Sequence, residues 1–211
     1  MNKILKIGIV SLALAAAGGG WAASASTAQP VTPMTPNDLV PALAVPQSQS
    51  DLEVAKALPA SAQSRIEVST ARIAGADELG QYVVATTGNR QEVCVFIRTN
   101  TEKHVTGGYC AKLVDFYSSG AFFGIHGSGT GGVNGDLMVY LLPRGVDTTS
   151  LTTRQGASFT GISRQANSQI LATTNPAALP SRLALQRLCG GPAFEFIGNH
   201  SVPPPASVPR S

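Results

Sequence analysis

Charged side chains are scarce in this sequence of 211 residues, because Asp, Glu, Lys and Arg together make up only 13% of it. That share is about half the usual value of roughly 25%, and it excludes a charge-rich disordered chain. The 15 basic residues nearly balance the 12 acidic ones, so the sequence offers no strongly basic surface to nucleic acid. Histidine is also rare, and the three histidines lack the spacing of metal ligands. We therefore expect no nucleic-acid partner, no metal and no cofactor.

Long apolar runs are missing except at the N-terminus, which excludes a multi-span membrane protein. Residues 1–25 begin with two lysines, continue through the 11 apolar residues Ile7–Ala17, and end in Ala23-Ser24-Ala25. This order predicts a signal peptide cleaved between Ala25 and Ser26. The 19 uncharged residues Ile7–Ala25 border on spanning length, so an uncleaved anchor is the alternative. Either reading predicts a secreted or extracytoplasmic protein, with membrane contact only through this segment.

Proline marks the predicted limits of the folded domain. Residues 26–50 carry five prolines and residues 198–211 carry four. Each proline fixes φ and removes a hydrogen-bond donor, so we expect neither helix nor sheet in residues 26–50, and we interpret this segment as a tether. The second segment is interpreted as a disordered tail, which leaves residues 51–197 as one globular domain.

Short segments rich in Val, Ile, Phe, Tyr and Thr recur through this domain and predict strands. They are Arg65–Ala74, Gln81–Thr86, Glu92–Thr99, Val105–Cys110, Ala121–Ile125, Leu137–Leu142, Ser158–Ile162, Gln169–Thr173 and Leu183–Cys189. Helical spacing appears only in Asp51–Leu58 and Ala111–Ser118. The expected fold is mainly β, or alternatively α+β. We expect a small sandwich or barrel of about eight to nine short strands with one or two short helices.

Two of the three cysteines lie on consecutive predicted strands. Cys94 and Cys110 are separated by 15 residues, and a hairpin can bring them within bridging reach in a compartment that permits disulfides. We predict this bridge, and closing such a loop contributes about 3 kcal/mol to stability. Cys189 is then expected to be a buried, inert thiol on the last strand, although the spacing alone leaves other pairings of the three cysteines open.

A glycine-rich run, Gly127–Gly135, is the most conspicuous candidate for a phosphate-binding loop. It lacks the Gly-Lys-Ser/Thr ending of such loops, and the segment that follows it is a predicted strand. His126 occupies the position where a serine-hydrolase elbow around Ser128 requires glycine. The run is therefore interpreted as a hairpin loop.

One enzymatic alternative rests on Cys110, which stands at the start of the predicted helix Ala111–Ser118, where the helix dipole activates a thiol. A Gly-Asp-Leu strand, Gly135–Leu137, follows it. That order resembles the papain-like peptidases that cleave bacterial cell-wall peptides, and the resemblance implies a cysteine nucleophile at Cys110. The sequence departs from the family at Ala111-Lys112, where Ser-Gly is expected, and only His200 follows the strand. The base would have to be His126 or His104.

A second resemblance covers residues Leu58 to Leu151. It is carried by the Leu58-Pro59 pair, the strands around Tyr82-Val83-Val84 and Val93-Cys94-Val95, and Cys110 before a helix-like stretch. The last shared element is Val139–Val146, a valine-rich strand followed by Pro-Arg-Gly-Val. This course resembles exported actinobacterial proteins that have no assigned activity. The resemblance implies a β-rich fold and supports the Cys94–Cys110 pairing, but it implies no catalytic residue.

The leading hypothesis is a non-enzymatic extracytoplasmic domain that binds an unknown protein or envelope component. An exposed aromatic patch of Phe116, Tyr117, Phe122 and Phe123 would give it a docking surface, although packing in the core is the more ordinary fate of such residues. The alternatives are the cell-wall peptidase that uses Cys110 and His126, and an anchored partner of a membrane complex.

Overall fold

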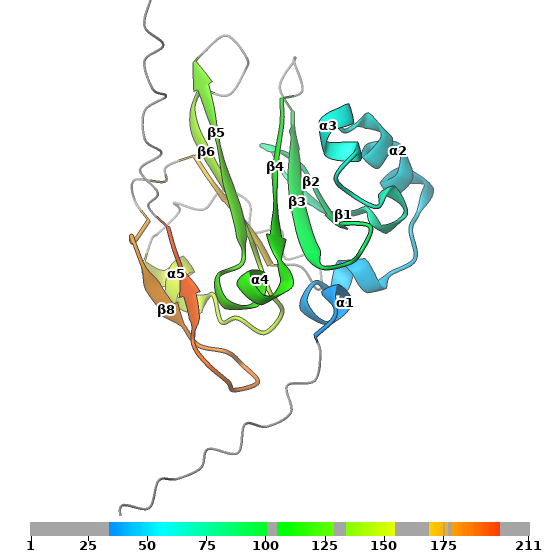
Figure 1. Ribbon diagram of the computed structural model, residues 1–211. Coiled ribbons are helices and arrows are strands. Elements are labelled where there is room, and N and C mark those ends of the chain that lie inside the picture. Colours follow the sequence, from blue (N-terminus) through cyan, green and yellow to red (C-terminus); the bar gives the residue numbers. More distant parts are fainter. Residues whose placement is uncertain are drawn as a thin grey trace, which may run out of the picture. The chain divides into compact units, whose positions relative to one another are not determined.

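Three antiparallel sheets make up most of the structure, which is a computed structural model that describes residues 34–100, 105–128, 134–154, 169–174, 176 and 179–198 (Figure 1). The first sheet has the strand order β1 (Arg72–Ala76), β2 (Gly80–Thr86), β3 (Glu92–Thr99) and β4 (Thr106–Lys112). The second contains β5 (Ala121–Ser128), β6 (Asn134–Leu142) and β7 (Gln169–Thr173), and the third contains β8 (Leu183–Leu185) and β9 (Phe194–Phe196). The prediction of a mainly β fold is confirmed, and none of these sheets closes into a barrel within the described residues.

Helices are short but more numerous than the sequence predicts. The described residues form α1 (Pro36–Leu39), α2 (Gln49–Ala57), α3 (Ala60–Gln63), α4 (Leu113–Ser119) and α5 (Thr149–Arg154), with 3-10 turns at Pro41–Ala44 and Val68–Thr70. The two predicted helices correspond to α2 and α4, and Gly120 ends α4 with φ 75°, as expected of a glycine stop. Within the described residues, no helix has the length and apolar character needed to cross a membrane.

The central strands are covered on both faces. Alternate side chains of β2, β3, β6 and β7 form one core shared by the first and second sheets, including Tyr82, Val84, Val95, Ile97, Val139, Leu141 and Ile170. The intervening side chains of β2 and β3 point the other way and pack under α2 and α3, whereas those of β6 pack against α5, β8 and β9. Figure 1 shows α2 and α3 beside the first sheet, and α5 and β8 beside the second. Strands buried on both faces consist of nearly continuous apolar residues, and segments such as Leu137–Leu142 are therefore easy to recognise in the sequence.

The proline-rich tether prediction is wrong for residues 36–44. Pro36 and Pro41 occupy the first turns of α1 and of the 3-10 turn, where the missing N–H costs no intrahelical hydrogen bond. Leu39, Val40 and Leu43 are buried in the core shared by the two sheets. The folded part therefore begins well before Asp51.

A carboxylate ties this N-terminal region to the first sheet. Asp51 caps α2 by accepting hydrogen bonds from the N–H and hydroxyl of Ser48, both 2.8 Å long, and it also accepts one from the N–H of Ile73 on β1 at 2.7 Å. Burial acts to raise the pKa of Asp51, but the hydrogen bonds from Ile73 and Ser48 outweigh it and hold the pKa below its ordinary value. Ionised Asp51 therefore stabilises the junction of α2 and β1.

Two strand predictions need correction. The strand predicted at Arg65–Ala74 is confined to β1, because a 3-10 turn occupies residues 68–70. The strand predicted at Leu183–Cys189 ends at Leu185, and β9 was not predicted at all. Cys189 is consequently an exposed free cysteine in a turn, followed by Gly190 and Gly191 with φ of 77° and 101°. The strand predicted at Ser158–Ile162 lies outside the described residues, as do residues 1–33 and 199–211.

The C-terminal end of the described chain is held by a buried tyrosine. Tyr140 of β6 donates a 2.7 Å hydrogen bond from its hydroxyl to the carbonyl oxygen of Gly198. Burial raises the pKa of Tyr140 well above its usual range, so the hydroxyl remains a donor. A Cβ at Gly198 would lie 2.3 Å from the Pro180 oxygen, so only glycine fits this position without a shift of the backbone.

Candidate binding site

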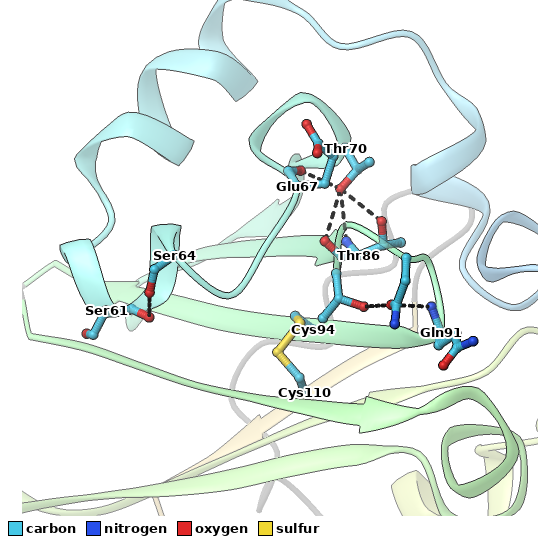
Figure 2. The surroundings of a disulfide bond; sticks show 10 residues. Ser61, Ser64, Glu67, Thr70, Thr86, Gln91, Cys94 and Cys110 are labelled. Atoms are coloured by element: carbon cyan, nitrogen blue, oxygen red, sulfur yellow. Dashed lines mark hydrogen bonds between the residues drawn. A yellow bond between two sulfur atoms is a disulfide. The ribbon is translucent and has the colours of Figure 1, made fainter.

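The disulfide predicted between Cys94 and Cys110 is present. The two residues stand directly opposite each other on β3 and β4, with a Cα–Cα distance of 3.9 Å. Both are buried, in the cluster that packs under α2 and α3. Figure 2 shows the bridge joining the two strands, with Thr86 and Gln91 among the surrounding residues. The bridge therefore fixes β3 and β4 to each other near one end of the first sheet.

The residues of the peptidase alternative are not arranged as that chemistry needs. Cys110 lies within β4, and α4 begins only at Leu113, so the prediction that Cys110 starts a helix is wrong. Its sulfur is bonded to Cys94 and is not a thiolate nucleophile in this form. His126 is on β5 of the second sheet, whereas Cys110 packs on the far face of the first sheet. The side chain of His126 lies outside the described residues, as do His104 and His200 entirely.

The four aromatic residues considered for a docking patch do not form a continuous exposed surface. Phe116 is completely buried in the core, whereas Tyr117, Phe122 and Phe123 are half-buried. The ring of Tyr117 is covered by the guanidinium of Arg187, which lies 3.8 Å from the ring centroid. Among the residues that the structure describes, the exposed large apolar side chains are Val45, Tyr109, Val114 and Leu188.

A hollow of about 670 Å³ opens on the surface beside the disulfide. It is lined by the turn between β2 and β3 (Thr87–Asn89 and Gln91), by Glu92 at the start of β3, and by Lys112–Val114 where β4 passes into α4. Val114 contributes an apolar wall and is 71% exposed. The hollow thus combines polar side chains, both signs of charge and an uncovered aliphatic residue.

The register of the disulfide strands places the two charges of the hollow together. Glu92 is the partner of Lys112 across β3 and β4, two residues from the Cys94–Cys110 pair and on the same face of the sheet. The N–H of Leu113 donates to the carbonyl oxygen of Gln91 at 2.9 Å, which extends the pairing past Lys112. Glu92 and Lys112 form no ion pair with each other or with another described residue; Lys112 is exposed and Glu92 is half-buried, and both line the hollow.

Hydrogen bonds fix the orientation of Asn89 in the turn. Its Oδ1 accepts from the hydroxyl of Thr87 at 2.8 Å and from the N–H of Gln91 at 3.1 Å. A backbone N–H can only donate, so the atom facing it must be the amide oxygen. The Nδ2 group of Asn89 is therefore the end left for other partners. Arg90 at the tip of this turn has φ 56°, a left-handed conformation.

A second hollow, of about 370 Å³, lies over β8 and β9 and differs in its electrostatics. Arg182 and Glu195, which line it, already form an ion pair of 3.2 Å. Arg182 and Glu195 thus partly compensate each other's charge, whereas no ion pair joins Glu92 to Lys112. The hollow beside the disulfide is for this reason the better candidate for a polar ligand.

Part of this site could be predicted from the sequence. Once Cys94 pairs directly with Cys110, the antiparallel register puts Glu92 opposite Lys112, and Gly88-Asn89 is recognisable as a turn. Of the glycine-rich run, Gly127 and Ser128 belong to β5 and Asn134 and Gly135 to β6, which pair as consecutive antiparallel strands; residues 129–133 lie outside the described residues. No group of three His, Cys, Asp or Glu side chains that could hold a metal occurs in the described part of the chain.

The comparisons with known proteins supply no relative. No protein-family model matches the chain, and neither a curated protein nor a solved structure does.

Proposed function

We propose that this protein is an exported, non-enzymatic binding domain that associates with a protein or component of the cell envelope. Export is supported by the signal-like residues 1–25. The buried Cys94–Cys110 bridge is consistent with it, because disulfides persist in oxidising compartments. The proposed docking site is the hollow beside the disulfide.

The observation that carries this proposal is the hollow itself. Its charged residues, Glu92 and Lys112, form no ion pair with a described residue and lie on two strands that the disulfide fixes. Preorganised polar groups lower the cost of ordering on binding, and Val114 supplies apolar area next to them. Such a combination favours recognition of a partner that is itself polar and partly apolar.

Sedimentation with envelope fragments from the host tests the proposal. The chain from Ser26 onward, Lys112→Glu and Lys56→Glu are compared. Lys56 is a suitable control because it is an exposed lysine at the end of α2 and does not line the hollow. We expect the unmodified protein to sediment with the fragments, Lys112→Glu to bind about tenfold more weakly, and Lys56→Glu to bind normally. Equal loss in both variants, or no binding by the unmodified protein, contradicts the proposal.

The peptidase alternative is tested in parallel. The oxidised and reduced proteins are incubated with cell-wall peptides, and the products are measured by mass spectrometry. Cleavage that disappears in Cys110→Ala would replace the binding proposal by an enzymatic one. Intact mass of the protein recovered from its host tests localisation, since cleavage before Ser26 is expected for a secreted form and a full-length chain for an anchored one.

A further inference from the structure

We infer that the hollow beside the disulfide binds a small zwitterion, namely an amino acid or a short peptide with a free amino and a free carboxyl end. This inference rests on the proposed binding function and specifies the ligand class. The ammonium group would be bound by Glu92, and the carboxylate by Lys112 and the Nδ2 group of Asn89.

The placement of the charges carries the first step. Glu92 and Lys112 are direct cross-strand partners, and the Cβ atoms of such partners lie about 4.5–5.5 Å apart. The amine nitrogen and the carboxyl carbon are separated by about 2.5 Å in an amino acid and by up to about 7 Å in an extended dipeptide, given the standard backbone dimensions. Two neighbouring opposite charges on the protein thus face two neighbouring opposite charges on the ligand.

The same placement disfavours ligands with a single charge. An anion attracted by Lys112 would also approach Glu92, and a cation attracted by Glu92 would approach Lys112. Like charges brought together weaken binding and thereby exclude the wrong ligand. A zwitterion is the ligand for which both charges of the hollow are favourable.

The neutral lining agrees with this assignment. Asn89 is oriented by Thr87 and Gln91 so that its NH₂ group remains as a donor, and a carboxylate oxygen accepts from such a donor. Val114 lines the same hollow and is 71% exposed, so an aliphatic ligand side chain can bury apolar surface against it. Because Lys112 is exposed and Glu92 only half-buried, we expect a weak complex with a Kd of about 1 mM.

Titration of the ¹⁵N-labelled chain from Ser26 with alanyl-alanine, followed by NMR, tests the inference. Saturable shifts are expected for the Asn89 side-chain amide and for the backbone amides of Lys112 and Leu113. N-acetyl-alanyl-alanine and alanyl-alanine amide, which each lack one charge, are expected to bind about fivefold more weakly. The absence of saturable shifts up to about 20 mM, roughly twenty times the expected Kd, overturns the inference, as does equal affinity for the blocked peptides.

Variants assign each charge to its ligand group. Lys112→Gln should bind alanyl-alanine and its amide equally, because the residue that distinguishes them is gone, whereas Glu92→Gln should lose the discrimination against the N-acetyl form. Lys56→Gln is the control, and the dispersion of each spectrum reports whether the variant is folded. If Lys112→Gln still discriminates against the amide, the assignment is wrong. If the peptide fails to bind while Lys112→Glu still loses envelope binding, only this inference falls and the proposed function remains.

Discussion

Removal of the Cys94–Cys110 bridge should lower the stability of the domain by about 4 kcal/mol. The bridge closes a loop with a sequence separation of 16 residues, and a loop of that length restricts the unfolded chain by about 3 kcal/mol. Both sulfurs are buried between the first sheet and the α2–α3 layer, so replacing both cysteines by alanine also leaves a void that costs about 1 kcal/mol. This loss is a large part of a total stability of about 5–15 kcal/mol.

Urea unfolding followed by far-UV circular dichroism measures the effect. With a urea dependence of about 2 kcal/mol per molar, the midpoint of the Cys94→Ala/Cys110→Ala variant should fall by about 2 M. Reductant should lower the midpoint of the unmodified protein and leave that of the variant unchanged. Cys189→Ala is the matched control, because Cys189 is exposed and unbridged and its replacement should change stability by less than about 0.5 kcal/mol. An unchanged midpoint in the double variant refutes the reasoning, and so does an equal loss in Cys189→Ala.

Three further changes test other parts of the fold by urea unfolding. Asp51→Ala should lower the free energy of unfolding by about 2 kcal/mol at pH 7. Because the pKa of Asp51 is lowered in the fold, this contribution is present above about pH 4 and is lost as the pH falls further. A stability difference between Asp51→Ala and the unmodified protein that persists undiminished at pH 2 contradicts this. Leu43→Ala should cost about 2–5 kcal/mol, whereas a loss near zero would mean that the proline-rich segment does not pack in the core. Tyr140→Phe should cost about 1–3 kcal/mol, because the carbonyl of Gly198 loses its buried donor, and an unchanged midpoint would show that this hydrogen bond does not stabilise the fold.

The strands β2, β3, β6 and β7 were predictable from sequence because their described side chains are buried on both faces. A segment such as Leu137–Leu142 has to be apolar at every position, and β-branched and aromatic residues at short spacing then suffice to locate it. The tether was mispredicted because proline was interpreted only as a breaker of structure. Pro36 and Pro41 instead begin helical turns, and the leucines that follow them could be assigned to the core only once the sheets were in place.

Only part of the candidate site could be predicted from the sequence. The pairing of Cys94 with Cys110 fixes the register and therefore the juxtaposition of Glu92 and Lys112. The hollow itself depends on tertiary packing, because it forms where the β2–β3 turn and the start of α4 flank the strand ends. The orientation of Asn89 likewise depends on hydrogen bonds within a turn conformation that includes the left-handed Arg90.

The burial of the N-terminal proline-rich segment has a consequence for the order in which the chain folds. The carbonyl of Leu39 accepts a 2.7 Å hydrogen bond from the N–H of Arg144, and Leu39 and Leu43 pack in a cluster that includes Ile170. A ribosome releases residues 34–45 long before these partners exist. The first part of the domain to be synthesised therefore cannot complete its packing until the second sheet has been made. Its docking then completes the core late in folding.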